Sequence, residues 1–478
     1  AASLTIATGS IRGIGRVTPF TTNVLVSIEV LRAFGATTAS ADWEEGQWSD
    51  YRGWPSAVGF DGGRLWWAGK DSIAGSVSDA FNSFDPTVEG DSGPINRTLP
   101  GGQVDTVNWI LSLQRLMVGG QGAEYSCRSD SLDGPLTPNN FNPKKGSTQG
   151  SAAVRAVAID NQGVYVQRGG TKAYTLALSS NQVFYDYTST DLCAIIPEIG
   201  KPQIVRMAVQ RQPDTRVHFV RSDGTVALLI FDSTEQVTCW IEIDTDGLVE
   251  DVAVLPGDVG DSEDHVYYVV KRTINGSTVR NLERWAFQSE CIGGTTSKLG
   301  DSFVVYSGAP ATVITGLGHL EAKQVTVWAD GVDVGTDSSN NLIYTVAGGQ
   351  ITLAAAASVV VVGLYYEAPF QSGKLLELAS QGGTTLGQMK AIRTVGVIMA
   401  NVHPKGLRIG RDLTDLTSMD NLPEIEAGTL VDQAVMRTNY DEDPIIFPGS
   451  WGTDERLCLL GAAPRPVTVL AAIVEVEV

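Results

Sequence analysis

Short runs of apolar residues, either alternating with polar ones or rich in Val, Ile and Phe, recur along most of this 478-residue chain. The segments NVLVSIEVL (23–31) and TVALLIF (225–231) illustrate the two patterns, and both are typical of β-strands. Helical periodicity is weak, and the best helix candidates are Thr106–Leu113 and Lys374–Ser380. The pattern therefore predicts an all-β protein.

Turn signals between these runs support the same fold class. A two-residue hairpin turn needs positive φ, which Asn, Asp and Gly adopt most readily. Four such dipeptides lie between β-prone runs: Asp223-Gly224, Asp246-Gly247, Asn275-Gly276 and Asp330-Gly331. We expect hairpins at these four positions.

One kind of segment recurs, in which aromatic or aliphatic residues run into a glycine or a charged turn. Its copies start 51, 48, 53 and 49 residues apart: Arg64-LWWAG, Arg115-LMVGG, Gly163-VYVQRGG, Arg216-VHFVRSDG and His265-VYYVVKRTING. A period of about 50 residues is the size of one four-stranded propeller blade. The sequence therefore predicts a β-propeller body with inserted small β-sandwich or barrel domains.

The remaining segments suggest four regions. We expect residues 1–40 to form a small β-module, which one interpretation takes as the end of a truncated N-terminal region. Residues 41–298 hold the propeller blades, and residues 299–368 form an inserted sandwich or barrel. Residues 369–478 are a C-terminal β region that completes the propeller or platform. The longest apolar stretch, Ile351 to Tyr366, is shorter than a bilayer span. We expect it to form a hairpin around Ala354–Ser358, and we expect the last run, Val467 to Val478, to pair within a sheet.

Charge and cysteine content narrow the function classes. The chain has 34 Lys and Arg against 54 Asp and Glu, a formal charge of −20. A free-standing nucleic-acid binder would normally be basic. The five cysteines include no Cys-x-x-Cys pair, which predicts reduced core cysteines in a chain that folds in a cytoplasm. The first ten residues lack the basic and apolar regions of a signal peptide.

Catalytic motifs are weak. The segment Gly90-Asp91-Ser92-Gly93-Pro94 is similar to the nucleophile segment of chymotrypsin-like proteases, whose histidine base lies upstream of the serine. The first histidine here is His218, and the others are His265, His319 and His403. No two are spaced as zinc ligands on one element. We expect the Gly90–Pro94 segment to be a polar turn.

Carboxylates give two further candidates. Asp244-x-Asp246-Gly247 and the group Asp258, Asp261, Glu263 and Asp264 could gather calcium, but neither continues into an EF-hand loop. The pairs Asp186/Asp191 and Glu283/Glu290 could serve a propeller glycosidase, depending on their separation in space. Solvated turn carboxylates and chance proximity are the stronger explanations, so we predict no catalytic, cofactor-binding or metal-binding residue, and no enzyme.

Aromatic residues carry more information. Trp43, Trp48 and Trp54 lie beside charged residues, which suits module junctions and subunit interfaces. The equally weighted alternative is that these side chains fill the first blade.

Several motifs, in order along the chain, resemble the tail nozzle (tail tubular B-like) proteins of short-tailed bacteriophages. They are WSDYRGWPSAVGFDGGRLWWAG, SVSDAFNSFD, VNWILSLQRLMVGGQGAEYSC, LTP at Leu136–Pro138, GVYVQRGG, RVHFVRSDGTVALLIF and GLGHLEAKQVTVWADG. Together they extend from about residue 40 to the end of the chain.

The resemblance implies a structural virion protein, assembled as a hexamer below the tail adaptor in the host cytoplasm. Such a ring forms the distal tail tube, contacts tail fibres and lets genomic DNA pass without sequence-specific binding; no cofactor and no membrane span belong to it. An acidic lumen would suit this passage, because counterion-release attraction would hold the DNA. Two alternatives stay open: a propeller glycosidase or depolymerase that attacks cell-surface polysaccharide, and a carbohydrate-binding adhesin.

Overall fold

The computed structural model describes residues 3–8, 11–22, 24–100, 106–129, 134–179, 186–235, 237–337, 339–375, 387–423, 425–426, 429–432, 436–441 and 445–477. The chain divides into two compact units, Ala1–Asp244 with Val249–Val254 and Thr245–Leu248 with Leu255–Val478. Helical structure in the described residues consists of three single turns of 3-10 helix, η1 (Gln288–Glu290), η2 (Gly318–Leu320) and η3 (Leu416–Ser418). The all-β fold class predicted from the sequence is confirmed.

The first unit begins with a small antiparallel sheet, which we call the arm sheet. Its strand order is β3-β2-β1-β4. The strands are β1 (Ser3–Thr8), β2 (Ile11–Thr22), β3 (Leu25–Arg32) and β4 (Trp43–Glu45). β3 is an edge strand, because it pairs with β2 alone in this sheet.

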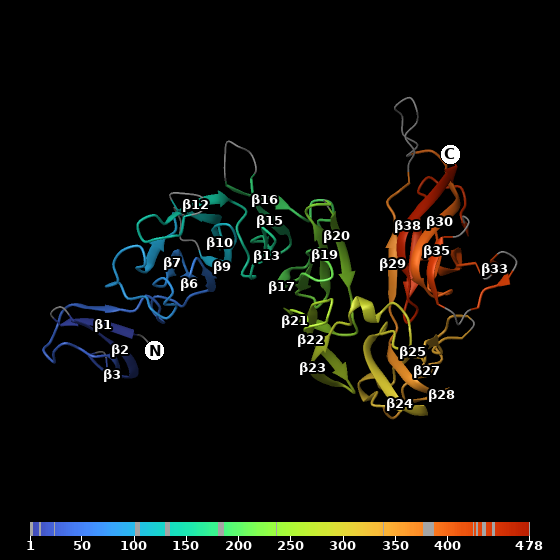
Figure 1. The fold of residues 1–478 in the computed structure, drawn as a ribbon, viewed down its shortest axis with the longest axis horizontal. Helices are drawn as coiled ribbons and strands as arrows, with labels where there is room; N and C mark the ends of the chain where they lie inside the picture. Colours follow the sequence, from blue (N-terminus) through green and yellow to red (C-terminus); the bar gives the residue numbers. More distant parts are fainter. Residues whose placement is uncertain are drawn as a thin grey trace. The chain divides into compact units, whose positions relative to one another are not determined.

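Four antiparallel sheets of four strands each follow in chain order, from blue to green in Figure 1. Each is a simple meander, so every strand pairs with its neighbours in sequence. Their strands are β5 (Ala57–Asp61), β6 (Arg64–Gly69), β7 (Ser72–Gly75), β8 (Ile95–Thr98); β9 (Val107–Ser112), β10 (Leu116–Gly120), β11 (Glu124–Arg128), β12 (Asn142–Ser147); β13 (Val157–Ile159), β14 (Gln162–Val166), β15 (Ala173–Leu178), β16 (Tyr187–Asp191); and β17 (Ile204–Gln210), β18 (Arg216–Arg221), β19 (Val226–Asp232), β20 (Val237–Ile243).

The repeated segments found in the sequence are the second strands of these sheets. β6, β10, β14 and β18 each carry one copy, and β22 (His265–Ile274) carries the fifth. β22 belongs to a three-stranded sheet with β21 (Leu248–Leu255) and β23 (Ser277–Arg284). The period of about 50 residues therefore reports one sheet per repeat, as expected for propeller blades.

Alternation along the strands explains why the sheets stack. In β10, Leu116 and Val118 join a core with Trp66 of the preceding sheet. Met117 points to the other face and joins a core with Tyr165 of the following sheet. Because successive side chains of a strand point to opposite faces, each inner sheet buries apolar side chains on both sides. No single blade could bury both of its faces by itself.

The helix expected at Thr106–Leu113 is wrong, because residues 107–112 form β9. Its apolar residues serve two different cores, Ile110 one and Trp109 the other, and a strand between two sheets satisfies both. The second helix candidate, Lys374–Ser380, lies outside the described residues from position 376 onward; Lys374 and Leu375 are not helical.

Three of the four expected hairpin turns are confirmed. Asn275 and Gly276 both have positive φ (49° and 76°) between β22 and β23, and Gly224 (φ 86°) turns β18 into β19. Asp330-Gly331 (φ 46° and 94°) joins β25 to β26. The expectation for Asp246-Gly247 is wrong, because it links β20 to β21, which belong to different sheets.

The second unit contains a sheet of order β24-β28-β25-β26, with β27 paired to β25. Its strands are β24 (Asp301–Thr315), β25 (Gln324–Ala329), β26 (Val332–Asp333), β27 (Tyr344–Thr345) and β28 (Gln350–Leu364). The hairpin expected around Ala354–Ser358 is wrong, because β28 runs through this segment. Its pairing with β24 shifts between Ala357 and Thr352, so the small alanines are accommodated as an irregularity within one long strand.

The C-terminal region holds a sheet of order β29-β37-β31-β32, a sheet in which β30 pairs with β35, β36 and β38, and the pair β33-β34. The strands are β29 (Glu367–Gln371), β30 (Ala391–Val402), β31 (Leu407–Gly410), β32 (Met419–Asn421), β33 (Ile425–Glu426), β34 (Thr429–Leu430), β35 (Arg437–Asp441), β36 (Ile445–Ile446), β37 (Cys458–Ala462) and β38 (Thr468–Glu477). β38 pairs with β30, which confirms that the last apolar run lies in a sheet.

The domain boundaries that the sequence predicts near residues 40, 298 and 368 stay a prediction. Within the part of the chain that the structure describes, no helix is long and apolar enough to cross a membrane.

Replacing Gly119 by Ala tests the contact between the second and third blade sheets. A Cβ atom at Gly119 would lie 2.0 Å from Cε2 of Trp109, and the buried Trp109 ring has no room to move away. We expect the free energy of unfolding to fall by about 1–3 kcal/mol, the usual cost of overpacking. Gly373→Ala is the control, because a Cβ there meets no atom within 4 Å. Equal urea midpoints for the two variants would contradict the packing described.

Candidate functional site

The Gly90–Pro94 segment is a turn built around the buried guanidinium of Arg64, which is 3% exposed. Its nitrogens donate to the carbonyl oxygens of Asp91 at 2.6 Å, Gly93 at 2.6 Å and Ser76 at 2.5 Å. A buried cation needs such partners to offset the loss of water. The segment therefore has a structural use, holding Arg64 of β6.

The four histidines have four different sets of partners. His218 is fully buried, and its Nε2 lies 3.3 Å from Oε1 of Gln210. Nδ1 of His403 accepts the backbone N–H of Lys405 at 3.1 Å, and Nε2 of His319 lies 3.0 Å from the carbonyl of Ser302. His265 lies beside Asp261. Burial lowers the pKa of His218 to about 3 and that of His403 to about 4.

The paired acids of the sequence are held in ion pairs with different cations. Asp186 contacts Arg115 and Arg128, while Asp191 lies 2.6 Å from Nζ of Lys172. Glu283 and Glu290 likewise pair with different partners, Arg272 at 2.6 Å and Lys298. These contacts are those of structural ion pairs.

The acidic groups proposed for calcium separate in the structure. Asp246 pairs with Lys323 at 2.9 Å. Glu263 is buried and accepts the backbone N–H groups of Gln288 and Ser289. Asp258 and Asp261 lie together, but with His265 as their third neighbour. The sequence therefore identified two members of this cluster and missed the histidine.

The five cysteines are free thiols. Cys127, Cys193 and Cys458 are buried, as predicted, whereas Cys239 is exposed and Cys291 is half-buried. Sequence reasoning also missed Glu124, which is fully buried. Ser151 donates to its carboxyl group at 2.8 Å, and burial raises its pKa.

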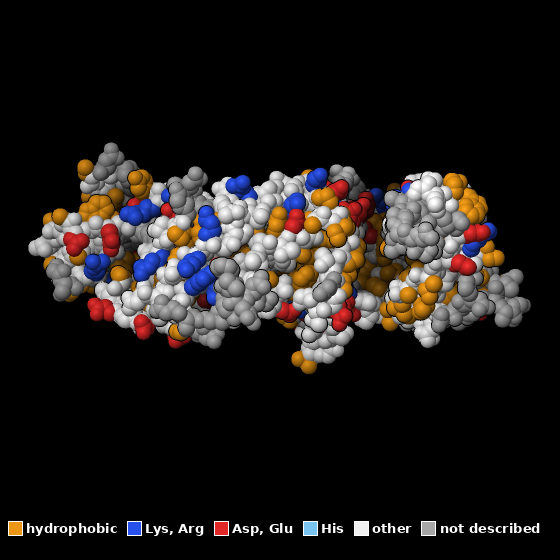
Figure 2. Space-filling view, turned by 90° about the horizontal axis from the view of Figure 1, so that it is seen from above, with side chains coloured by type: hydrophobic (Ala, Val, Ile, Leu, Met, Phe, Trp, Pro, Cys, Tyr) orange, Lys and Arg blue, Asp and Glu red, His pale blue; other side chains and the backbone are white. Residues whose placement is uncertain are grey.

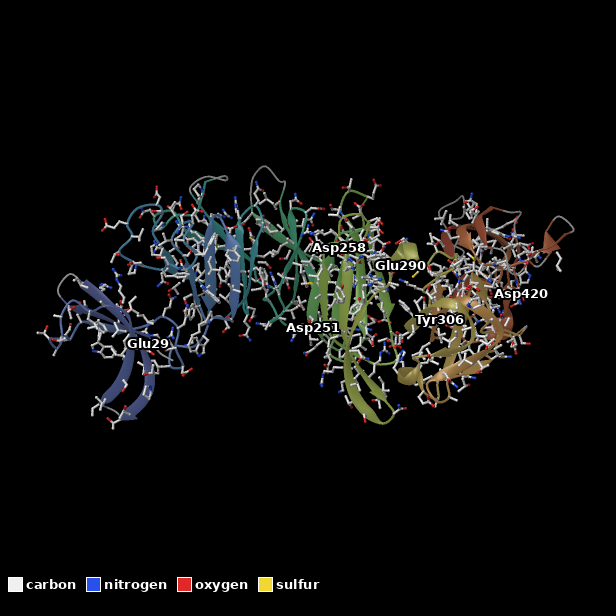
Figure 3. The ribbon with its side chains drawn as sticks, turned by 60° about the horizontal axis from the view of Figure 1, so that its bottom comes forward. Glu29, Asp251, Asp258, Glu290, Tyr306 and Asp420 are labelled. Carbon is white, nitrogen blue, oxygen red and sulfur yellow. The ribbon has the colours of Figure 1, made fainter. Side chains whose placement is uncertain are left out.

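The arm sheet is the most unusual surface of the first unit. Among the described residues 4–45, Gly13 and Gly15 alone are buried. Leu25 (60% exposed), Val30 (53%) and Leu31 (50%) lie open on β3, the strand that carries Glu29 (Figure 3). Figure 2 shows hydrophobic side chains gathered at this N-terminal end, at the left of the view. The signal in the sequence was apolar residues on both faces of one strand.

The cross-strand ion pairs of the arm sheet add little to its stability. Arg12 lies 3.2 Å from Glu44 and Arg16 lies 3.4 Å from Glu29, with both pairs about half exposed. Exposed pairs of this kind contribute about 0–1 kcal/mol. Neither buried apolar side chains nor strong ion pairs therefore stabilise the described part of this sheet.

The sequence left open whether the three tryptophans fill the first blade or lie at a junction or subunit interface, and the structure gives different answers for different residues. Trp48 packs on the first blade sheet, where its Cζ3 lies 3.0 Å from the Cβ position of Gly69. Trp43 is 61% exposed and Trp54 52% exposed, and Tyr51 beside them is 88% exposed. Of the exposed rings, Trp43 lies on β4 of the arm sheet.

The second unit has a polar cavity of about 220 Å³. The hydroxyl of Tyr365 donates to Glu367 at 2.6 Å, and Arg408 lies 3.6 Å from the same carboxylate. Arg465 is nearly buried and pairs with Asp333 at 2.7 Å. The cavity lining also includes Asn340, Asn341, Lys405 and Asn421. It offers hydrogen-bond donors and acceptors together.

Comparisons with known proteins give structural likeness only. No family model and no curated protein matches the chain. An exo-β-1,3-galactanase from Phanerochaete chrysosporium matches with 9% identity and a TM-score of 0.26, over 88% of this chain and 95% of that one. A protein from Lactobacillus plantarum matches with 12% identity and a TM-score of 0.29, over 75% and 98%. A periplasmic gluconolactonase from Pseudomonas aeruginosa matches with 11% identity and a TM-score of 0.29, over 76% and 99%.

Two of these matched structures are enzymes by name, which contradicts the prediction from the sequence that this chain is not an enzyme. We withdraw that prediction. The matched names agree with the sugar-acting alternative better than with a tail nozzle, about which they say nothing. With TM-scores of 0.26 to 0.29, they assign no activity to this chain.

The buried His218 predicts a pH dependence of stability. Its pKa is lowered from 6.5 to about 3 in the folded chain, so between these values the unfolded chain binds a proton that the folded chain does not. Stability therefore falls as the pH decreases from 6.5 toward 3. In urea titrations at pH 7 and pH 4.5, His218→Gln should reduce the loss seen in the parent chain. The exposed Lys144→Gln is the control, and an unchanged loss in His218→Gln would refute the assignment.

Proposed function

We propose that this chain is a structural subunit of a homo-oligomeric assembly, and specifically of the hexameric tail nozzle of a short-tailed bacteriophage. The observation that carries the proposal is the arm sheet, which exposes Leu25, Val30 and Leu31 and buries no apolar side chain among its described residues. Exposed apolar side chains on both faces of one strand suit a protein–protein contact. An open edge strand such as β3 adds unpaired backbone groups that another chain can complete.

The proposed assembly is a ring, in which the arm sheet of one subunit contacts a different surface of the next. A patch at one place on a subunit that binds a different patch on the next copy makes a head-to-tail contact, and rings close when the rotation permits. The arm sheet lies at the start of the chain and is far too small to be stable alone. Covering it with the neighbouring subunit would bury its apolar residues.

Charge and sequence resemblance supply the particular role. The ordered motifs resemble nozzle proteins, and each subunit carries a formal charge of −20. An acidic tube does not attract DNA by counterion release, which suits a conduit through which the genome leaves. Within this proposal the ring docks to the tail adaptor and to tail fibres in the virion.

The mass and symmetry of the purified chain test the proposal. Light scattering should give six copies, and negative-stain microscopy should show a six-fold ring with a central hole. Val26→Asp/Val30→Asp places two charges on the exposed face of β3 and should convert the ring to monomers, with circular dichroism unchanged. Thr188→Asp/Thr238→Asp adds the same charges at exposed strand positions elsewhere and should leave the ring intact. A monomeric parent chain would overturn the proposal.

A second candidate is binding or cleavage of cell-surface polysaccharide, the alternative that the sequence left open. The polar cavity favours it, because Tyr365, Glu367 and Arg408 line a space of about 220 Å³. An apolar cavity of about 150 Å³ already holds benzene, so a single sugar ring fits this volume. The exposed Trp43, Tyr51 and Trp54 offer further faces on which sugar rings could stack.

Binding to polysaccharide from bacterial envelopes tests this candidate. We expect the parent chain to be retained on immobilised envelope polysaccharide, and Arg408→Gln/Asn421→Ala to weaken binding at least tenfold, because both side chains line the cavity. Release of soluble sugar would identify cleavage rather than binding alone. Lys144→Gln, on β12 and outside this cavity, should bind like the parent. Absence of retention by the parent chain would refute this candidate.

A further inference from the structure

We propose that Asp258, Asp261 and His265 form a binding site for a divalent transition-metal ion, which takes Zn²⁺ in preference to Mn²⁺ and Ca²⁺. The ligand atoms of these three side chains all lie within 4.8 Å of one another. Asp258 and Asp261 belong to the loop between β21 and β22, where Figure 3 labels Asp258, and His265 is the first residue of β22. The proposal is independent of both candidate functions above.

The loop brings the two carboxylates together through its own backbone bonds. The N–H of Asp261 donates to the carbonyl of Asp258 at 3.0 Å, and the N–H of Asp258 donates to Oδ2 of Asp261 at 3.2 Å. A Cβ at Gly257 would lie 2.5 Å from the carbonyl oxygen of Glu263, so the two ends of the loop touch. Glu263 itself is committed to the start of η1, because it accepts the N–H groups of Gln288 and Ser289.

Aromatic rings outside the loop hold the imidazole of His265 in place. The cluster therefore differs from an ordinary group of exposed surface carboxylates. The His265 ring packs against Phe287 and Tyr267, with ring centroids 4.9 and 6.3 Å away, and its side chain is only 13% exposed. Nδ1 is buried and has no hydrogen-bond partner among the described residues. Nε2 is the nitrogen that faces the carboxylates, 3.0 Å from Oδ2 of Asp261.

The separation between His265 and Asp261 is compatible with the spacing of neighbouring ligands on a tetrahedral metal. With metal–ligand distances of about 2.0 Å, two ligand atoms at the tetrahedral angle lie about 3.3 Å apart. The Nε2–Oδ2 separation of 3.0 Å is close to that value. Asp258 is exposed, and its carboxylate lies within 4.8 Å of the other two ligand atoms, so it supplies the third ligand of the proposed set, with water as the fourth.

The donor set selects the ion. One imidazole nitrogen and two carboxylates suit Zn²⁺ and its neighbours in the transition series, whereas Ca²⁺ takes six to eight oxygen ligands. The Irving–Williams order places Zn²⁺ above Mn²⁺ at the same site. Two carboxylates and a neutral imidazole also balance the charge of a divalent ion. The structure thus replaces the calcium group considered from the sequence, in which Glu263 and Asp264 took the place of His265.

Metal titration of the full, chelator-treated chain tests the proposal. In isothermal titration calorimetry with ZnCl₂, MnCl₂ and CaCl₂, we expect one saturable Zn²⁺ site, at least tenfold weaker Mn²⁺ binding and no Ca²⁺ binding at this site. Zn²⁺ should also raise the unfolding temperature, because an ion that binds only the folded chain stabilises it. No saturable Zn²⁺ binding, or Ca²⁺ binding tighter than Zn²⁺ binding, would overturn the proposal.

Variants assign the binding to these residues. His265→Gln and Asp258→Asn should each weaken Zn²⁺ at least tenfold, and the exposed Asp258 makes its variant safe for folding. His319→Gln is the matched control, since His319 instead bonds the carbonyl of Ser302, and it should bind Zn²⁺ like the parent chain. Unfolding temperatures measured without metal show that each variant is folded. If both ligand variants bind Zn²⁺ as tightly as the parent chain, the site lies elsewhere and the proposal fails.

Discussion

The structure depends on burying both faces of each inner blade sheet against its neighbours. Strands of five or six residues expose half of their side chains on each face, and a four-stranded meander has no interior of its own. In β10, Leu116 and Val118 enter one core while Met117 enters another. The hydrophobic effect therefore acts between successive sheets, and a change such as an extra methyl group at Gly119 would act on two sheets together.

The same constraint explains why the arm sheet is a candidate contact surface. It has the strand content and apolar residues of a blade sheet, but no neighbouring sheet of the described chain covers it, and its few ion pairs are exposed. Buried charged side chains elsewhere in the chain, in contrast, have several hydrogen-bond partners. Arg64 is held by three loop carbonyls, and Arg465 by Asp333, Asn340 and Thr336. Charges with partners of this kind stabilise the framework, whereas the apolar side chains of the arm sheet are exposed.

Short sequence patterns were sufficient to predict structural features that depend only on neighbouring residues in the chain. The period of about 50 residues located the second strand of every repeat, and Asn275-Gly276 located a hairpin. Asp246-Gly247 has the same chemistry as the confirmed turns, yet it joins strands of different sheets, because a dipeptide does not record which strands pair. The hairpin predicted around the alanines at 354–357 was wrong for a related reason, since pairing with β24 keeps β28 extended.

The same distinction between local sequence and tertiary structure applies to the candidate sites. The sequence by itself determined the all-β class, the repeat, the acidic charge and the presence of Asp258 and Asp261 near one another. Only the tertiary structure decided that Glu263 turns away to η1 and that His265 takes its place, because rings from β22 and the segment before η1 hold the imidazole there. The arm sheet and the polar cavity also required the fold. Exposure, and contact between distant segments, depend on what packs against each strand rather than on the residues within it.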